Sequence, residues 1–416
     1  MQMNEAKQKF RLTSLERAWI LYDVGNSAFV LLVATLIPIF FNALAEGGGL
    51  SSVEYLAYWG YAASAVTVIT AVLSPILGTL ADTRNFKKPI FTFCVAVGVI
   101  GCCAMGMAST WLPFLLIFIF AKVGFSGSLV FYDSMLSDVT VPDRMDEVSS
   151  KGYAWGYIGS CVPFVVCLAL VLGAGSVGIS QMTALNLALF ITAAWWLVTT
   201  LPLLRQYKQV HFVEVQEHAI RQSFARIGHT LRHLKEDRQV FWFLLAFFCY
   251  IDGVYTIIDM ATAYGTALGL DTTGLLLALL VTQIVAFPSA LVFGRLSGQY
   301  PSGTLIPVCI AAYAGIALFA FFLKHQWQFW VLAVVVGMFQ GGIQALSRSH
   351  FAKIIPPEKS GEYFGLFDIC GKGASFLGTM IVSVGSQLTG SANVGVGSLI
   401  VLFVVGFVLF RVSDQK

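Results

Sequence analysis

Charged residues are scarce in this chain, since Asp, Glu, Lys and Arg together make up 11% of its 416 residues. Hydrophobic residues make up 57%, and the mean hydropathy of +0.79 is far above that of a soluble globular protein of ordinary composition. So little charge excludes a soluble enzyme and a nucleic-acid-binding protein. The composition is that of an integral membrane protein.

Several other signals are absent as well. The eight cysteines all lie in apolar runs, so no pair of cysteines in the loops predicts a disulfide. The N-terminal segment has no apolar core followed by a small-residue cleavage site, and we therefore expect no removable signal peptide. No Gly-x-x-x-x-Gly-Lys-Ser loop occurs, and no Ser/His/Asp, Cys/His or metal-ligand cluster has a convincing spacing. We expect no enzyme activity, no metal and no cofactor.

Long apolar runs dominate what is present. A helix needs ~20 mainly apolar residues to cross ~30 Å of hydrocarbon. Twelve stretches meet this requirement: roughly 17–42, 54–80, 88–108, 111–136, 150–173, 182–204, 239–266, 272–297, 303–323, 327–350, 361–388 and 392–411. They predict an all-α membrane protein with twelve transmembrane helices in two six-helix bundles.

A charged stretch, residues 206–238, separates the two sets of six spans. It must lie in water, because ionised groups in hydrocarbon have to be paired or neutralised. Apolar residues recur in it at helical spacing with basic residues between them, which predicts an amphipathic helix on the inner leaflet; a docking surface for a regulatory partner is the alternative. The expected order is a segment 1–16, a bundle 17–205, the linker 206–238, a bundle 239–411 and a tail 412–416.

The basic residues determine the orientation. If the N-terminus is cytoplasmic, 22 of the 25 lysines and arginines, Arg348 among them, fall in the inner segments, and only Lys324 falls in an outer connection. By the positive-inside rule both termini and the linker are cytoplasmic. We expect a multi-pass protein, in the inner membrane if the source is bacterial.

Four short motifs carry a family resemblance. The 2–3 connection, Gly78 to Lys88, reads GTLADTRNFKK and resembles the signature of the major facilitator superfamily. The stretches Tyr22–Ser27, Gly341–Ser349 and Phe364–Lys372 are similar to one branch of that superfamily, the autophagy-linked vacuolar amino-acid effluxers of fungi and their uncharacterised bacterial relatives. The resemblance implies the facilitator fold, a monomer, spans 1, 4, 7 and 10 around a central cavity, and amino acids or similar small metabolites as solutes.

Polar residues recur at helical spacing on those four spans. Ionisable residues inside a span are costly and by default mark a pathway. The four stripes are Asp23, Asn26 and Ser27; Lys122, Ser126 and Asp133; Asp252, Tyr255 and Asp259; and Gln340, Gln344 and Ser347. From them we predict the substrate-binding residues Asn26, Lys122, Asp252, Tyr255, Gln340 and Gln344, and we expect Asp23, Lys122, Asp252 and Gln344 to meet around one vestibule.

The remaining roles concern protons and gating. Asp23, Asp133 and Asp252 are the candidates for proton coupling, and Lys122 is expected to pair with a solute carboxylate or with Asp252. Asp82, Arg84, Lys87, Arg144, Asp368 and Lys372 are the candidates for gating. For the groups inside the spans the alternative is a set of fixed ion pairs that only hold helices together. For Asp82, Arg84, Lys87 and Arg144 the alternative is that they only supply the positive-inside signal, and for Asp368 and Lys372 it is an internal pair within one helix.

The sequence therefore favours a secondary transporter that moves a small polar or zwitterionic organic solute by alternating access, with protons as a candidate coupling ion. An exporter of amphipathic lipids or drugs, and a transporter-like sensor that binds ligand without moving it, remain open as alternatives. The expected partners are the solute and the lipid bilayer.

Overall fold

The computed structural model describes residues 11–214, 234, 236–267 and 269–414, and in these residues the chain is almost entirely helical. The first bundle consists of α1 (Ser14–Ala34), α2 (Leu36–Gly47), α3 (Ser52–Ala81), α4 (Lys87–Met105), α5 (Trp111–Ser134), α6 (Leu136–Val139), α7 (Pro142–Leu172), α8 (Ala174–Val177) and α9 (Gln181–Gln206). The second bundle consists of α11 (Arg238–Ala267), α12 (Thr272–Leu296), α13 (Ser302–Phe321), α14 (Gln326–Ile354), the short η1 (Pro357–Lys359), α15 (Ser360–Thr389), α16 (Ala392–Gly397) and α17 (Ile400–Asp414).

Eleven segments of the described chain are long and apolar enough to cross a membrane. One of them, Ser14–Gly47, combines α1 and α2, and another, Ala392–Asp414, combines α16 and α17. The 30-residue helix α15, which packs against α3 and α11, is not among these eleven segments. The predicted fold class, an all-α membrane protein built from two helical bundles, is confirmed.

The first span is interrupted where the sequence predicts one continuous helix. The backbone of Thr35 leaves the helical region with φ −129°, so α1 ends there and α2 begins at Leu36. At its other end α1 begins with a capping box, in which the Thr13 hydroxyl accepts from the Glu16 N–H and the Glu16 carboxylate accepts from the Thr13 N–H. This cap orients Glu16 at the cytoplasmic end of the helix.

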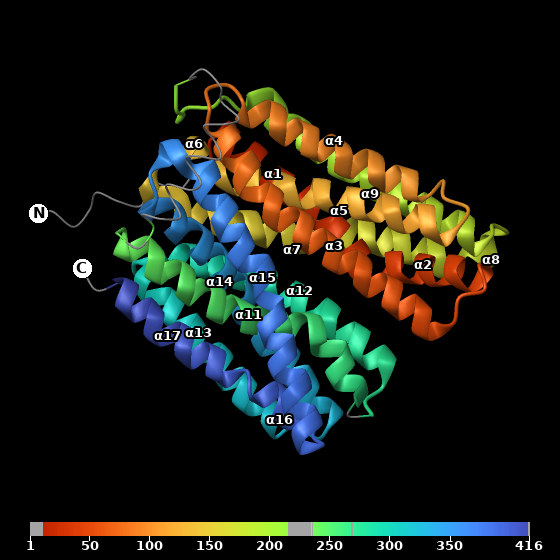
Figure 1. Ribbon diagram of the computed structural model, residues 1–416. Coiled ribbons are helices and arrows are strands. Elements are labelled where there is room, and N and C mark those ends of the chain that lie inside the picture. The colour runs from red at the N-terminus through yellow and green to blue at the C-terminus, as the bar shows by residue number, and fades with distance from the viewer. Residues whose placement is uncertain (1–10, 215–233, 235, 268, 415–416) are drawn as a thin grey trace, which may run out of the picture.

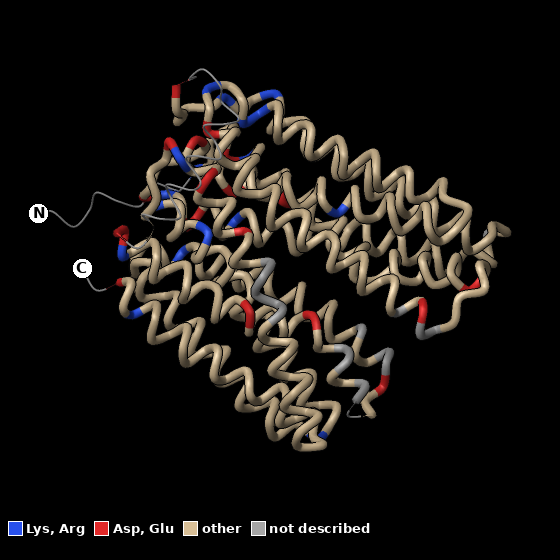
Figure 2. The backbone as a smooth tube through the Cα atoms, in the orientation of Figure 1, with Lys and Arg blue, Asp and Glu red and all other residues tan. Residues whose placement is uncertain are grey.

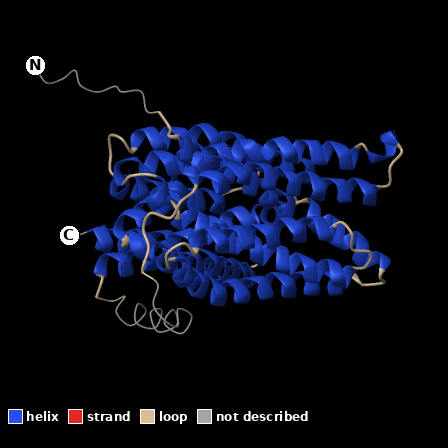
Figure 3. Cartoon of the chain, turned by 90° about the horizontal axis from the view of Figure 1, so that it is seen from above, coloured by secondary structure: helices blue, strands red, loops and turns tan. Residues whose placement is uncertain are grey.

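The two bundles pack against each other through α3 with α15, α7 with α12 and α14, and α5 with α15. Figure 1 shows them close together at the end that carries both termini and diverging away from it. Figure 3, a view from above, shows the long helices of both bundles running in one common direction. Basic and acidic residues crowd at the end with the termini (Figure 2), which the positive-inside rule assigns to the cytoplasm.

Most of the predicted amphipathic linker lies outside the described residues. Its first residues, from Tyr207 to Glu214, are described and lie along the cytoplasmic end of the first bundle. Val213 forms an isolated parallel bridge with Thr83, in which the Val213 N–H donates to the Asp82 carbonyl. The start of the linker is therefore held by backbone hydrogen bonds.

Candidate functional site

The side chain of Arg348 crosses from the second bundle into the first. It projects from α14, and only 2% of it is exposed. Its Nη1 donates to Asp133 Oδ1 at 3.0 Å and lies 3.7 Å from Asp23 Oδ2. Its Nε donates to the Ser149 hydroxyl at 2.9 Å, and its Nη2 donates to the Ser149 carbonyl at 3.0 Å. A charge so deeply buried is held by two carboxylates of the other bundle.

Aromatic rings complete the surroundings of this guanidinium. Its Cζ lies 4.6 Å from the ring of Trp19, 5.3 Å from that of Tyr132 and 4.3 Å from that of Tyr153. Trp19 and Tyr132 stack on each other at 4.3 Å. We call this set the Arg348 box; it consists of Trp19, Asp23, Tyr132, Asp133, Ser149 and Tyr153, all from the first bundle.

A second contact between the bundles lies at the start of α15. Asp82, which follows α3, accepts from the backbone N–H of Gly361 at 2.7 Å and of Glu362 at 2.8 Å. These are unpaired donors of the first turn of α15, where a negative charge is favourable. Lys87 is completely buried; its ammonium lies 3.6 Å from Asp82 and donates to the Ser360 hydroxyl at 2.8 Å.

The α3 and α15 backbones approach closely at this point. A Cβ atom on Gly361 would lie 2.5 Å from the carbonyl oxygen of Gly78, so no larger residue fits without separating the helices. We call the set of Gly78, Asp82, Lys87, Ser360, Gly361 and Glu362 the cytoplasmic gate. Burial raises the pKa of Asp82 to about 7, although the Lys87 ammonium and the two amide donors favour its charged form.

Further polar contacts join the bundles in the parts of the helices nearest the cytoplasmic end. Asp146 on α7 accepts from the Ser349 hydroxyl and from the Lys353 ammonium of α14, each at 2.6 Å. The Ser74 hydroxyl on α3 donates to Asp368 on α15 at 2.7 Å. Together with the Arg348 box and the gate, these contacts close the cytoplasmic side of the molecule.

Lys122 and Asp259 are oppositely charged residues on different bundles that interact electrostatically. Lys122 is half-buried on α5 and lies 4.8 Å from the centre of the Phe125 ring. Asp259 is exposed on α11 and interacts electrostatically with Lys122. Lys122 precedes Asp133 by eleven residues on α5, which places the pair about 16 Å along the helix from the Arg348 box.

Asp252 lies elsewhere, inside the second bundle. It is completely buried, and its Oδ1 accepts from the Gly378 N–H at 2.8 Å and from the Thr256 hydroxyl at 3.3 Å. Its Oδ2 has no hydrogen-bond partner among the described residues. Thus the structure places no described contact between Lys122 and Asp252, because α11 turns Asp252 towards α15 and Asp259 towards α5.

The expectation that Asp23, Lys122, Asp252 and Gln344 surround one vestibule is therefore not met. Asp23 is sealed in the Arg348 box and Asp252 in the second bundle, whereas Lys122 and Gln344 are half-buried. Helical spacing shows which residues share one face of a helix, but the rotation of that helix in the packed bundle determines which residues the face contacts.

Among the other predicted ligands, Asn26 and Gln340 are buried and Tyr255 is half-buried. Their roles in binding remain predictions.

The predicted gating residues separate into three groups. Asp82, Lys87 and Asp368 take part in contacts between the bundles, as described above. Arg84 lies at the surface, 3.4 Å from Glu214, and Arg144 binds Glu16 at 2.6 Å within the first bundle. The side chain of Lys372 lies outside the described residues.

Sequence reasoning missed two central residues. Arg348 was assigned to the cytoplasmic surface by the positive-inside count, although it follows Gln340 and Gln344 at intervals of four and so continues their stripe. Asp138 was not singled out; it is buried and accepts from Tyr207 at 2.5 Å and from the His211 N–H at 2.9 Å, with the Lys87 ammonium 3.9 Å away. Asp138 therefore contacts both the start of the linker and the gate residue Lys87.

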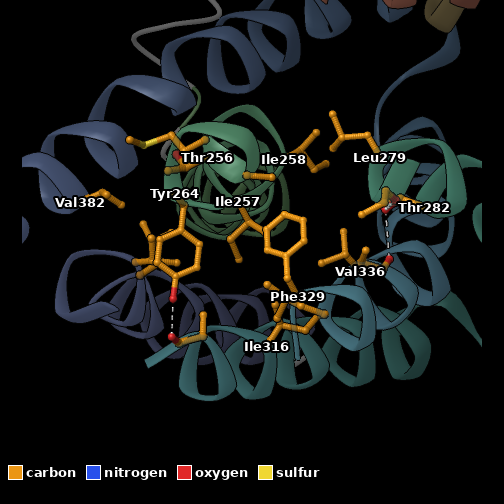
Figure 4. A pocket seen from close by; sticks show the side chains of 18 residues that line it. Thr256, Ile257, Ile258, Tyr264, Leu279, Thr282, Ile316, Phe329, Val336 and Val382 are labelled. Atoms are coloured by element: carbon orange, nitrogen blue, oxygen red, sulfur yellow. Dashed lines mark hydrogen bonds between the residues drawn. The ribbon is translucent and has the colours of Figure 1, made fainter. Parts of the chain in front are cut away.

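The second bundle also contains an apolar pocket (Figure 4), whose empty volume of about 640 Å³ includes open solvent. Its walls come from α11 to α16 and include Ile257, Met260 and Phe329. The polar groups in the wall are satisfied within the protein, as when the Tyr264 hydroxyl donates to the Ala320 carbonyl at 2.6 Å. The cavity therefore suits an apolar guest.

Comparison with known proteins agrees with this architecture. The family model described as "Vacuole effluxer Atg22 like" matches residues 14–143 and 137–416. The chain belongs to the Atg22-like family of the major facilitator superfamily. This Atg22-like protein is 42% identical over 411 residues to the uncharacterized MFS-type transporter YxiO of Bacillus subtilis (strain 168), covering 98% of this chain and 96% of that one.

More distant relatives of this Atg22-like protein are fungal. Autophagy-related protein 22 of Saccharomyces cerevisiae (strain ATCC 204508 / S288c) is 25% identical over 315 residues, covering 66% of this chain and 59% of that protein. Autophagy-related protein 22 of Coccidioides immitis (strain RS) is 25% identical over 315 residues, covering 65% of this chain and 51% of that protein. The match thus extends over little more than half of these fungal relatives.

Solved structures share the fold of this Atg22-like protein. The human organic anion transporter MFSD10 gives a TM-score of 0.72 at 13% identity, covering 95% of this chain and 98% of that chain. The facilitator FucP in the outward conformation gives a TM-score of 0.72 at 17% identity, covering 97% and 98%. The protein is a multi-pass integral membrane protein with the major facilitator fold.

Proposed function

We propose that the chain is a secondary transporter that moves a small zwitterionic solute, an amino acid or a similar metabolite, by alternating access. The observation that carries the proposal is the electrostatic interaction between Lys122 and Asp259. An ammonium and a carboxylate, one from each bundle, match the carboxylate and the ammonium of a zwitterion. A solute held by both bundles also couples its own binding to their relative movement.

The polar contacts below this pair support the same mechanism. Arg348, Asp82 and Lys87 hold the cytoplasmic side closed, while Lys122 and Asp259 lie further along α5 and α11, away from the cytoplasmic ends of these helices. Alternating access requires such an asymmetry, with one side sealed at a time. Asp252 remains our candidate for proton coupling, because a buried carboxylate with one unpartnered oxygen is the kind of group whose charge changes during a cycle.

The test is uptake into proteoliposomes. Purified protein is reconstituted and labelled amino acids are offered with and without a pH gradient. We expect Lys122→Ala and Asp259→Asn each to reduce uptake at least tenfold, and Asp252→Asn to abolish the response to the gradient. Matched controls are Lys324→Ala and Glu46→Gln, which remove the same charges from exposed positions. Uptake at the wild-type rate in Lys122→Ala and Asp259→Asn would refute the proposed site.

The apolar cavity favours one other function, the export of amphipathic lipids or drugs. Its wall offers no unsatisfied polar group to orient a polar solute, but it has room for part of an apolar molecule. Ala333→Leu places three additional carbon atoms in the cavity. If the amphipathic function holds, this variant loses drug or lipid efflux; if the zwitterion function holds, it keeps amino-acid uptake.

A further inference from the structure

We propose that the Arg348 box is a binding site for an organic cation, an ammonium or guanidinium group, and that Arg348 acts as a tethered cation that occupies this site while the cytoplasmic side is closed. The inference rests on the alternating access proposed above. It adds a second site, on the cytoplasmic side, to the pair formed by Lys122 and Asp259.

The first argument is the origin of the walls. Every residue of the Arg348 box lies between Trp19 and Tyr153, on α1, α5 and α7, whereas Arg348 itself lies on α14. The box and its occupant therefore belong to different bundles. When the bundles separate on the cytoplasmic side, Arg348 has to leave with the second bundle and the box stays with the first.

The second argument is the chemistry of the walls. Two carboxylates, Asp23 and Asp133, face the guanidinium, and three aromatic rings lie within 5.3 Å of its central carbon. Carboxylates beside aromatic faces recognise organic cations, because the ring quadrupole attracts a positive charge and the ring surface packs against its carbon atoms. A proton alone needs a carboxylate but no aromatic wall.

The third argument is that Arg348 leaves part of the box unsatisfied. Asp23 is 94% buried, and its Oδ2 accepts no hydrogen bond in the described chain, since the 3.7 Å to Arg348 Nη1 exceeds hydrogen-bond distance. Gly152 provides the space beside it, because a Cβ atom there would lie 3.0 Å from Asp23 Oδ2 and 3.1 Å from Arg348 Nη2. A free cation can approach Asp23 more closely than one tethered to α14.

A mutual exclusion follows from this arrangement. Once Arg348 withdraws, two carboxylates remain next to each other in a largely apolar site, and an unpaired buried charge is strongly unfavourable. A solute ammonium neutralises them. While it occupies the box, Arg348 cannot return and the cytoplasmic side stays open; when Arg348 returns, it expels the cation towards the cytoplasm.

The experiment follows the opening of the cytoplasmic side. Spin labels are placed at Phe86 and Glu358, which are exposed on opposite bundles at this end, and native cysteines are replaced. Methylguanidinium chloride is titrated into the labelled protein, with methylurea as the uncharged analogue and sodium chloride at equal ionic strength as controls. We expect the population with the longer label distance to increase and to saturate only with methylguanidinium.

Variants separate a cation site from a general effect of charge. Tyr153→Leu removes one ring and leaves both carboxylates, so the half-saturating concentration should rise about two- to fivefold. Asp133→Asn should abolish saturation. A response to sodium chloride or methylurea equal to that with methylguanidinium, or an unchanged response in Tyr153→Leu, would overturn the proposal, and the second result would indicate a purely ionic or protonic site.

Arg348→Ala provides an independent measurement. In this variant the box is vacant even when the bundles are closed, so methylguanidinium should raise the melting temperature of the variant more than that of the wild type, in which Arg348 competes for the box. If the variant does not fold, the distance measurement on the protein with Arg348 intact still decides. Zwitterion uptake without a methylguanidinium response would leave the proposed function standing and refute this inference; the reverse result would leave the box and refute the Lys122 site.

Discussion

Replacement of Asp82 by asparagine should remove the pH dependence of the cytoplasmic gate. The carboxylate of Asp82 accepts two backbone N–H groups of α15 and lies beside the buried Lys87 ammonium, and its pKa in this closed conformation is raised to about 7 by burial. When the gate opens, Asp82 becomes exposed and its pKa falls towards the ordinary value of about 3.9. The closed conformation thus binds a proton more tightly than the open one.

The sign of the effect follows from that difference. A group whose pKa is higher in the closed state stabilises that state fully below about pH 4, and this contribution is lost as the pH rises through about 7. A difference of about 3 pKa units corresponds to roughly 4 kcal/mol at 1.36 kcal/mol per unit. Rising pH should therefore favour the open gate between about pH 4 and 7, and change little above pH 8.

The asparagine variant keeps the size of the side chain but cannot ionise. Its Oδ1 can accept one of the two N–H groups and its Nδ2 cannot accept the other, so closure is weakened by about 1–3 kcal/mol at every pH. In the spin-label pair at Phe86 and Glu358, the wild type should show an open fraction that rises with pH. Asp82→Asn should show a fraction that does not change with pH and that exceeds the wild-type fraction at low pH.

A histidine also lies near the gate. The His211 ring lies 2.9 Å from Asp138, which in turn lies 3.9 Å from Lys87. His211→Gln is therefore the control, and it should retain the pH dependence of the wild type. The reasoning is refuted if Asp82→Asn opens with the same pH profile as the wild type, or if His211→Gln alone removes that profile.

The remaining predictions concern the gate and the linker. Gly361→Val should shift the protein towards the open conformation, seen as a longer Phe86–Glu358 distance, because even a Cβ atom would lie 2.5 Å from the Gly78 carbonyl oxygen; Gly315→Val, where a Cβ atom meets nothing within 4 Å, should not. Tyr207→Phe should lower the free energy of unfolding by about 1.5–3 kcal/mol in denaturant titration, because Asp138 loses a buried hydrogen bond of 2.5 Å; an unchanged midpoint would contradict this.

The sequence predicted the residues of the cytoplasmic gate better than it predicted which residues meet at the solute site. The signature from Gly78 to Lys88 pointed to Asp82 and Lys87, and both lie between the bundles. Arg84 and Arg144 are also basic residues of cytoplasmic connections, but they do not lie between the bundles. Arg84 binds Glu214 at the surface, and Arg144 binds Glu16 within the first bundle. Residue type and loop position could not distinguish these cases.

Hydropathy, loop charge and motifs in the sequence alone determined the membrane class, the two sets of spans and the cytoplasmic end, because the cost of polar groups in hydrocarbon acts on each segment separately. Only the tertiary structure decided which polar residues meet. It turned Asp252 into the second bundle, placed Asp259 towards Lys122, and inserted Arg348 between Asp23 and Asp133. The physical reason is that helical spacing defines a shared face, whereas the rotation and contact of two helices depend on packing across the whole chain.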